Sequence, residues 1–512
     1  MSSLSAHLPA LQVVLPLLSA PFAVLLRHGG FAFGIVTAGA WAAFACAIGL
    51  WLQTGEAGII SYHIGSWPPP WGIEYRVDRL ASFVLLLVSG TAAIVLPYSR
   101  ASIEHEIPRE LHYLYYAMFG LCLAGLLGIT ITGDAFNVFV FLEISSLSTY
   151  VLIALGRDRR ALAASYRYLI MGTIGATFFV IGIGFLYLMT GTLNIVDLGE
   201  RLRTVEDSRP VLAALAFITV GVSLKLALFP LHQWLPNAYT YAPSAVTAFL
   251  AATATKVSVY VLIRFWFSVF GETLIFEKLP LPQILLLLSL AAMFAASFIA
   301  IFQDNLKRLF AYSSVGQIGY ITLGMSFDSV NGLGAAILHL FNHGITKAAI
   351  FLLIGGVVLG LAKNSAVPNS RGVPAGAVPP APTFDRLAGL AKRMPLTCFG
   401  IVLAGLSLIG VPGTAGFVSK WYLILAAMEA GQFWIVAAIL LSSLLAIAYV
   451  WRFVEVAYFK PAPEGTTKQE APLGLLIPAW LLVIGTIWFG LDTSFTVGTA
   501  TEAALQLVKA GR

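Results

Sequence analysis

Six ionisable side chains stand within long apolar stretches of this sequence. They are Glu143, Lys225, Lys256, His339, His343 and Lys420. A charge at the centre of a lipid bilayer costs roughly 2.5–3.5 kcal/mol, so such residues persist only where a protein partner or water satisfies them. Histidine exchanges protons near neutral pH, and a buried lysine or carboxylate can gain or lose one. We therefore predict that the six residues form a relay for protons.

Glu143 and Lys225 are natural partners, because opposite charges on two helices of one bundle attract. A lysine beside a carboxylate keeps its proton, whereas burial without the counter-charge favours the neutral amine. That change of state is the switch that a proton relay needs. The alternative is a static ion pair that only fixes the packing of two helices.

Lys256 has no acidic residue near it in the sequence. A structural role for an unpaired buried lysine is hard to find, so we favour the relay. The alternative is snorkelling, in which the long lysine side chain extends so that its amine reaches the membrane surface. Lys256 lies too near the centre of its segment for that. Lys420 lies eight residues after Pro412, and we interpret it as the counterpart of Lys225 in the second half of the chain.

His339, His343 and Lys347 follow one another at intervals of four residues. Four residues advance a helix by about 400°, so the three side chains share one face with a drift of about 40° per step. One buried histidine is usually a satisfied core residue, but two histidines and a lysine on one stripe favour proton transfer. The histidines could reach one metal ion, yet no buried carboxylate or thiol lies nearby in sequence, so we predict no metal site.

The elements that position these residues are long apolar helices. Of 512 residues, 59% are hydrophobic and 11% charged, against about 25% charged in a soluble domain. A bilayer core requires about 20 apolar residues per helix. The sequence therefore predicts an all-α polytopic membrane protein with about fourteen transmembrane helices, at residues 8–27, 31–53, 79–98, 111–131, 135–155, 163–190, 211–236, 242–268, 281–302, 308–326, 331–361, 395–427, 432–458 and 471–491.

Two of these helices, the seventh and the twelfth, are interrupted at matching places. The seventh contains Pro230 and Pro236, and the twelfth contains the run GVPGTAG at 410–416. Proline removes a backbone hydrogen bond and clashes with the preceding turn. Broken helices in two halves point to inverted repeats with sites near the midplane, although harmless kinks are the alternative. His232 lies between the two prolines, where it either shares a proton with freed carbonyls or caps the break.

Loop charges predict the orientation. If residues 156–162 (GRDRRAL) are cytoplasmic, the loops on that side carry most of the basic residues, which places both termini outside the cytoplasm in a cell membrane. Residues 367–382 are rich in Pro, Gly and Ser and predict a flexible loop, which leads into a short surface helix (FDRLAGLAKRMP). The net charge of +6 is small, so we expect the basic residues to set topology rather than to bind nucleic acid.

Redox and nucleotide chemistry find no support in the sequence. Cys46, Cys122 and Cys398 form no CxxC pair, and the chain has no phosphate-binding loop. We therefore predict no disulfide and no bound cofactor.

Around these residues the chain resembles proton-translocating antiporter-like subunits, which occur in respiratory complex I, membrane-bound hydrogenases and Mrp-type multisubunit Na⁺/H⁺ antiporters. The core signature is KLALFPLHQWLPNAYTYAPSAVTAFLAATATKVSVYVL at 225–262. Further matching segments are SWPPPWGIEYRVDRLASFVLLL (66–87), GDAFNVFVFLEISSLSTYVLIAL (133–155), DNLKRLFAYSSVGQIGYITLG (304–324) and HLFNHGITKAAIFLL (339–353). The resemblance covers nearly the whole chain, and its motifs are specific.

This resemblance implies fourteen helices with two inverted five-helix repeats. The implied divisions are helices 1–3 (1–110), the first repeat (111–268), the second repeat (269–458), and helix 14 with a tail (459–512). It also implies roles: a glutamate–lysine pair, a bridging lysine, a central histidine and a terminal lysine, carried respectively by Glu143 with Lys225, by Lys256, by His339 or His343, and by Lys420.

The chain departs from the family pattern at three places. PGTAGF replaces the commoner PPxSGF at the second break, which leaves the fine shape of that helix open. Arg167 stands where many members carry lysine. Lys420 stands where one complex I type carries glutamate, which argues against that type.

The resemblance is strongest to the D-type subunits of Mrp antiporters. We accordingly expect a subunit of a monovalent cation/proton antiporter, whose proton relay is coupled to Na⁺ or K⁺ efflux elsewhere in the assembly. Its expected partners are other membrane subunits, these ions and the lipid bilayer, and the chain is not expected to be catalytic alone. The alternatives are a proton-pumping subunit of a complex I-like NADH:quinone oxidoreductase or membrane-bound hydrogenase, and a scaffold whose buried charges only hold packing.

Overall fold

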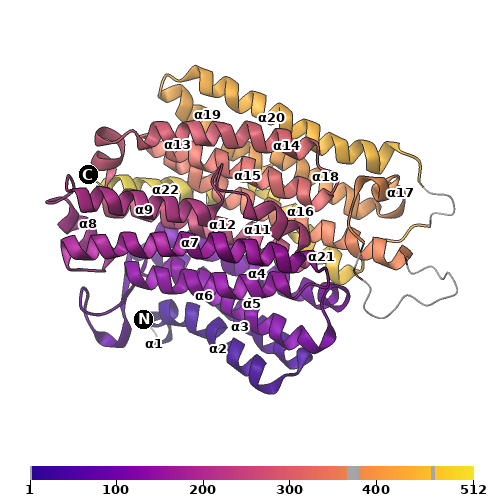
Figure 1. Cartoon of the computed structure of the whole chain (residues 1–512), viewed down its shortest axis with the longest axis horizontal. Helices are drawn as coiled ribbons and strands as arrows, with labels where there is room; N and C mark the ends of the chain where they lie inside the picture. The colour runs from indigo at the N-terminus through magenta and orange to yellow at the C-terminus, as the bar shows by residue number, and fades with distance from the viewer. Residues whose placement is uncertain (1–2, 366–377, 379, 463–466, 512) are drawn as a thin grey trace.

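The computed structural model describes residues 3–365, 378, 380–462 and 467–511, and nearly all of them lie in helices that run along a common direction (Figure 1). A two-stranded antiparallel sheet, β1 (Ile60–His63) and β2 (Glu74–Val77), pairs Ile60 with Val77. The sheet marks what we call the hairpin end of the bundle. The loop with Arg157, Arg159 and Arg160 marks the opposite, Arg-rich end.

The fourteen apolar segments predicted from the sequence are all helical. Twelve helices among the described residues are long and apolar enough to cross a membrane; the other two predicted spans are α15 and the pair α18–α19. The spans are α2 (Leu8–Leu26), α3 (Gly29–Ala57), α4 (Arg79–Glu106), α5 (His112–Ile131), α6 (Ala135–Ala154), α7 (Arg160–Thr190), α9 (Arg209–Leu226) with α10 (Trp234–Tyr241), α11 (Ser244–Ala252) with α12 (Ala254–Ile263) and η3 (Arg264–Phe270), α13 (Leu281–Ala291) with η5 (Ala292–Ala296) and α14 (Ser297–Ile301), α15 (Leu306–Met325), α16 (Val330–Ser365), α18 (Pro395–Ile409) with α19 (Ala415–Glu429), α20 (Phe433–Val454) with η7 (Glu455–Phe459), and α21 (Leu473–Leu491).

Shorter elements connect these spans or lie at the two ends. They are α1 (Ser3–Ala6), η1 (Ile64–Ser66), η2 (Arg109–Leu111), α8 (Ile195–Leu202), η4 (Thr273–Lys278), η6 (Phe384–Leu387) and α17 (Leu390–Arg393). A longer helix, α22 (Ser494–Gly511), follows α21.

The two predicted helix breaks are confirmed. The seventh span stops at Leu226 and resumes as α10, and the left-handed Ala227 (φ 61°) begins the break. The twelfth stops at Ile409 and resumes at Ala415 across Gly410 and Gly413, both with positive φ. Pro236 is a correction, because it lies inside α10 and breaks nothing; an early position in a helix has no preceding carbonyl for its ring to meet.

Two further breaks were not predicted from the sequence. The eighth span divides at Thr253 (φ −121°, ψ −56°), between α11 and α12. The fourteenth ends at Leu491, and the chain continues as α22 where the sequence predicts only a tail. Figure 1 shows α21 and α22 in opposite halves of the bundle.

One helix, α16, forms the centre of the packing. It contacts α4, α11, α15, α18, α19, α21 and α22, and 94% of its most apolar stretch is buried in the protein. His339, His343 and Lys347 are therefore deep in the protein. Elsewhere small residues bring backbones together: a Cβ at Gly221 would lie 2.5 Å from the Gly175 carbonyl, so α7 and α9 touch directly.

The prediction of one short surface helix after the long loop is wrong. Its residues make the single turns η6 and α17, which are separated by Gly389 (φ 64°), where any Cβ would collide with Ala462. Most of the loop predicted at 367–382 lies outside the described residues.

Candidate functional site

The Glu143–Lys225 pair predicted from the sequence is present in the structure. Lys225, in the last turn of α9, places Nζ 3.5 Å from Glu143 Oε1 and donates to Ser146 Oγ at 2.7 Å. The lysine side chain is 4% exposed, whereas that of Glu143 is 24% exposed. The carboxylate thus connects a buried amine to the outer surface of the protein.

A small polar cavity of about 20 Å³ lies beside Lys225. Hydroxyl groups of Ser145, Ser146 and Thr149 from α6 and Ser258 from α12 line it. A space of this size holds about one water molecule with several hydrogen-bonding partners. It lies between Lys225 and the helix that carries Lys256.

Lys256 is 1% exposed and lies three residues after the Thr253 break. Its amine donates to the carbonyl of Ala251 (2.5 Å) and to Thr255 Oγ1 (3.4 Å). The sequence predicts no acidic partner, and both hydrogen bonds are made within the eighth span. The helix break that sequence reasoning missed therefore provides the acceptor for this lysine.

His339 has an acceptor available at each ring nitrogen. Nε2 donates to Gln317 Oε1 at 2.9 Å, and Nδ1 lies 2.7 Å from Ser419 Oγ. The Ser419 hydroxyl can also donate to the carbonyl of Gly416, at 3.1 Å. It can therefore donate to a neutral ring, or accept from a charged one while donating to Gly416. Both protonation states of His339 are satisfied.

His343 stacks on His339, with ring centroids 5.8 Å apart and planes at 9°. Neither ring nitrogen of His343 has a hydrogen-bond partner among the described residues, although the side chain is 2% exposed. Lys347, one turn further along α16, donates to the carbonyl of Phe310 (2.8 Å) and to Ser313 Oγ. The predicted stripe is thus real, and its middle member is the unsatisfied one.

Lys420 lies in α19, and its amine reaches back across the twelfth-span break. Nζ donates to the carbonyls of Leu408 (3.0 Å) and Ile409 (2.9 Å) and to Ser443 Oγ (3.0 Å). It also lies 4.4 Å from the centre of the Tyr320 ring. The Leu408 carbonyl additionally accepts from Gln317 Nε2 at 3.4 Å, which links Lys420 to His339 through Leu408 and Gln317.

His232 lies in the seventh-span break and is 8% exposed. Its ring stacks on Phe229 (5.1 Å) and meets Tyr312 edge-on (6.3 Å). Nδ1 has no hydrogen-bond partner among the described residues. It caps no helix with that nitrogen, so its part in proton transfer stays a prediction.

The predicted residues form two connected groups. Lys225, Glu143 and the small cavity form the first. His339 and Lys420 form the second, where they are joined through Gln317, a residue that the sequence did not indicate. Lys256 and His343 lie between them by sequence and by helix contacts, since α12 packs against α5 and α16. Among the residues that the structure describes, no three His, Cys, Asp or Glu side chains gather as metal ligands.

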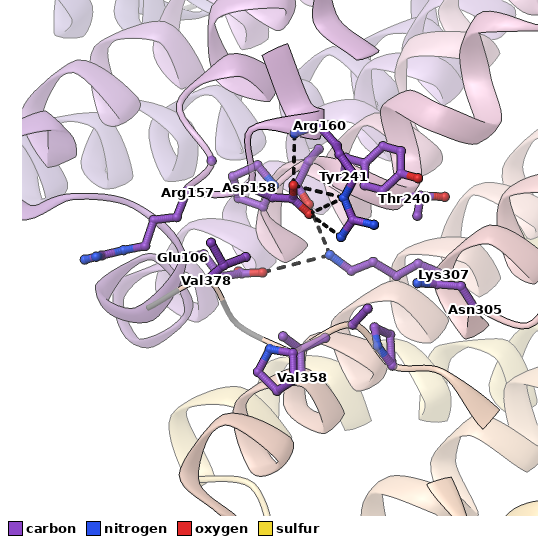
Figure 2. A pocket seen from close by; sticks show the side chains of 16 residues that line it. Glu106, Arg157, Asp158, Arg160, Thr240, Tyr241, Asn305, Lys307, Val358 and Val378 are labelled. Carbon is purple, nitrogen blue, oxygen red and sulfur yellow. Dashed lines mark hydrogen bonds and ion pairs between the residues drawn. The ribbon is translucent and has the colours of Figure 1, made fainter. Parts of the chain in front are cut away.

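A buried cluster at the Arg-rich end was missed by sequence reasoning (Figure 2). Glu106, the last residue of α4, accepts from Ser244 N (2.9 Å), Ser244 Oγ (2.8 Å) and Ser102 Oγ (2.7 Å). Lys307 Nζ lies 3.9 Å from Glu106 and donates to the Ala242 carbonyl at 3.1 Å. The predicted third helix ends at residue 98, eight residues before Glu106. Lys307 stands directly before the predicted tenth helix, which begins at residue 308.

A cavity of about 60 Å³ opens beside this cluster. Asp158 and Arg160 line it together with Glu106 and Lys307. Burial disfavours the charged form of Asp158, but hydrogen bonds from Arg160 outweigh it and lower the pKa of this loop carboxylate. Acidic and basic side chains therefore surround the start of the eighth span.

Another missed cluster lies at the hairpin end. Asp78 caps α4 and pairs with Arg264, which donates to the Tyr260 hydroxyl at 3.0 Å. These side chains line a cavity of about 280 Å³. Lys256, Tyr260 and Arg264 are spaced four residues apart, so polar groups continue from the membrane interior toward this end.

Comparison with known proteins shows which family the chain resembles. The family described as NADH:quinone oxidoreductase/Mrp antiporter, TM, matches residues 132–446. The N subunit of an NADH-quinone oxidoreductase from Desulforudis audaxviator is 41% identical, over 98% of this chain and 99% of its own length. The D subunit of a Na(+)/H(+) antiporter from Bacillus subtilis is 28% identical, over 97% of this chain and 96% of its own.

Solved structures show the same fold. A chain of the archaeal membrane-bound sulfane sulfur reductase is 29% identical, with a TM-score of 0.86 and 98% of each chain covered. A chain of the Mrp complex from Dietzia sp. is 24% identical, with a TM-score of 0.87 over 99% of this chain and 98% of that one. Both belong to multisubunit membrane complexes.

Proposed function

Because the chain belongs to the NADH:quinone oxidoreductase/Mrp antiporter transmembrane family, we propose that it is the proton-translocating subunit of a multisubunit monovalent cation/proton antiporter. One observation carries the proposal: each of three buried lysines lies at a helix break. Lys225 precedes the first break, Lys256 follows the Thr253 break, and Lys420 bonds across the third. The breaks supply backbone acceptors to Lys256 and Lys420, which let these lysines hold or release a proton inside the membrane, whereas Lys225 has Glu143 and Ser146 as acceptors.

In this proposal Glu143 controls the charge of Lys225. When the carboxylate is charged and close, the lysine keeps its proton; when the pairing weakens, the proton leaves through the hydroxyl-lined cavity toward Lys256. His343 and His339 receive it on α16. Gln317 and the Leu408 carbonyl hold His339 and Lys420 in one hydrogen-bond network. Neither group can pass a proton on, so water is expected to carry it from His339 to Lys420.

The driving ion acts through a neighbouring protein of the complex. Glu143 lies on an outward stripe of α6 with Val140 (37% exposed) and Leu147 (52% exposed) on either side. A partly exposed carboxylate in a membrane span is costly when it faces lipid, so a partner subunit is expected to cover it. The similar chains of known structure stand in multisubunit complexes, which supports such a partner.

The Arg-rich end is assigned to the cytoplasm, with both termini outside. Lysine and arginine favour the cytoplasmic side of membrane proteins, and Arg157, Arg159 and Arg160 cluster at this end. In that orientation the Glu106–Lys307 cavity faces the cytoplasm, and the Asp78–Arg264 cavity faces outward.

A redox-driven proton pump is the second candidate. It is favoured by the 41% identity to a protein named as the N subunit of an NADH-quinone oxidoreductase, a match that spans almost the full length of both chains. The proton path would be the same, and electron transfer in other subunits would drive it.

Proton movement in inverted membrane vesicles that contain the assembled complex tests the proposal. An imposed Na⁺ or K⁺ gradient is expected to drive proton movement without an electron donor. Proton movement only when a quinone-reducing donor is added would replace the antiporter by the redox-driven pump. A Lys225→Ala complex that lacks subunits, rather than one that assembles and does not transport, would instead indicate the scaffold.

A further inference from the structure

Asp492 lies on the outer surface of the bundle, at the break between α21 and α22. Phe489 and Phe495, three residues away on either side, both contact Phe341, with ring centroids 5.7 and 6.0 Å apart. Phe341 lies between His339 and His343 on α16. Asp492 is therefore at the depth of the two histidines.

Two other contacts give the same depth. Gly490 packs against the break of the twelfth span, where a Cβ at 490 would lie 2.4 Å from the Thr414 backbone. Toward the hairpin end, Glu502 pairs at 2.7 Å with Arg79, the first residue of α4. Ten residues separate Glu502 from Asp492, which is about 15 Å of helix. Arg79 begins a helix long and apolar enough to cross a membrane, so we take it to mark one edge of the hydrocarbon core. A distance of about 15 Å from that edge is half of a core about 30 Å thick.

The charge of Asp492 has no counter-charge within the described part of the chain. Oδ1 accepts from Ser494 N (3.1 Å) and Ser494 Oγ (2.6 Å), which caps α22. Among the described residues it forms no ion pair, whereas Glu143 at a similar depth has Lys225. A carboxylate that faces lipid at mid-depth costs roughly 2.5–3.5 kcal/mol. Something other than lipid is needed to cover it.

The surface beside Asp492 suits a second helix. Ser494 and Gly498 are exposed and four residues apart on α22, and a Cβ at Gly498 would meet nothing within 4 Å. Small residues at this spacing let a neighbouring transmembrane helix approach closely. Trp488 (60% exposed) and Leu491 (72% exposed) continue the surface along α21. Apolar side chains such as Trp488 and Leu491 could face lipid equally well. The argument for a partner helix therefore rests on the carboxylate of Asp492 and on the small residues Ser494 and Gly498.

We propose that the surface formed by Trp488, Leu491, Asp492, Ser494 and Gly498 binds a transmembrane helix from a partner protein of the complex. That helix places a lysine, an arginine or a polar hydrogen-bond donor beside Asp492. The inference rests on the proposed function only in that the chain works inside a multisubunit complex. Lipid is the rival occupant.

Co-purification of subunits with the affinity-tagged chain, from membranes with the whole complex, tests the docking surface. Asp492→Asn keeps the helix cap and removes the charge, and Gly498→Leu fills the small-residue face without touching the chain itself. Asp492→Asn is expected to lower the recovery of partner subunits about three- to thirtyfold, the range for one interhelical hydrogen bond in a membrane. Gly498→Leu is expected to lower it as well, because it keeps the two helices apart. The matched control is Gly184→Leu, on α7, where a Cβ also meets nothing and recovery is expected to be unchanged.

Wild-type recovery with either Asp492→Asn or Gly498→Leu overturns the proposal. A second measurement leaves Asp492 and Gly498 intact: Leu491→Cys, with a cysteine-directed photo-cross-linker, is expected to join another subunit. Cross-linking to lipid alone would overturn the proposal even if a variant had folded poorly. Neither measurement involves transport, so a complex that cross-links at 491 but exchanges no cation would contradict the proposed function and leave the docking surface standing.

Discussion

The two lysines at the proline- and glycine-containing breaks lie on opposite sides of their breaks. Lys225 is the second-last residue of α9, before the break, whereas Lys420 is the sixth residue of α19, after the break. Counted from the break, the residue of α18 that matches Lys225 is Leu408, whose carbonyl accepts from Lys420. Lys420 is therefore a counterpart of Lys225 in its predicted role and not in its position.

Their surroundings differ in kind. Lys225 has a carboxylate and one hydroxyl, and Lys420 has two carbonyls, one hydroxyl and an aromatic ring. A full counter-charge holds a proton until the pairing changes, while the partial charges at a helix C-terminus hold it more weakly. The first lysine is thus suited to gating by Glu143 and the second to release.

Replacement of Lys225 is expected to have the largest effect. Lys225→Ala removes the proton carrier, and Lys225→Arg keeps the charge and the pairing with Glu143 but cannot deprotonate. We expect both complexes to assemble and to lose proton movement in inverted vesicles by about 100-fold or more, the lower limit typical of a lost proton-transfer group. Wild-type rates with arginine would mean that Lys225 supplies only a fixed charge.

Glu143 is the next test, because it is the element that Lys420 lacks. Glu143→Ala leaves a lysine that can lose its proton instead of unfolding the helix, so we expect normal membrane levels with transport nearly abolished. Glu143→Asp retains the charge at a longer reach and is expected to keep partial activity. Normal proton movement by Glu143→Ala, measured at matched expression, would show that the pair has no gating role.

The features of this comparison that depend on the type of side chain could be predicted from the sequence. Opposite charges in two apolar segments indicated Glu143 with Lys225, and Pro230 and the glycines at 410–416 indicated the two breaks. The acceptors of Lys420 and Lys256 could not be predicted, because they are backbone carbonyls and every residue has one. The break at Thr253 could not be predicted either, because neither threonine nor alanine is a usual helix breaker.

Polar residues near predicted helix ends were also misjudged. Glu106 and Lys307 are ordinary charges in sequence, and only the extension of α4 to Glu106 brings them beside Ser244. Asp492 looked like the first residue of a tail. Hydropathy alone could not show that α22 continues the fourteenth span, because α22 carries polar residues such as Thr496 and Thr499, which are buried where the helix packs against α16 and α4.

Lys420 gives the third test. Lys420→Ala is expected to block proton movement without dissociating the complex. Lys420→Glu is expected to retain some activity, because a carboxylate can also relay protons, whereas Lys420→Arg should be poor, because guanidinium stays charged. If arginine works as well as lysine while glutamate is inactive, Lys420 provides only a fixed positive charge, and its place in the relay is wrong.

The smallest expected effects come from the hydroxyl groups beside the two lysines, and they test the comparison most finely. Ser146→Ala removes the 2.7 Å acceptor of Lys225 and leaves only Glu143 at 3.5 Å. Ser443→Ala removes one of three acceptors of Lys420, and the carbonyls of Leu408 and Ile409 remain. A typical hydrogen bond contributes about 0.5–1.5 kcal/mol, or roughly two- to twelvefold in rate. We expect Ser146→Ala to slow proton movement toward the upper end of that range and Ser443→Ala toward the lower end or not at all. The opposite order would mean that the second lysine depends on its hydroxyl more than the first, and that the carbonyls freed by the break do not hold its proton.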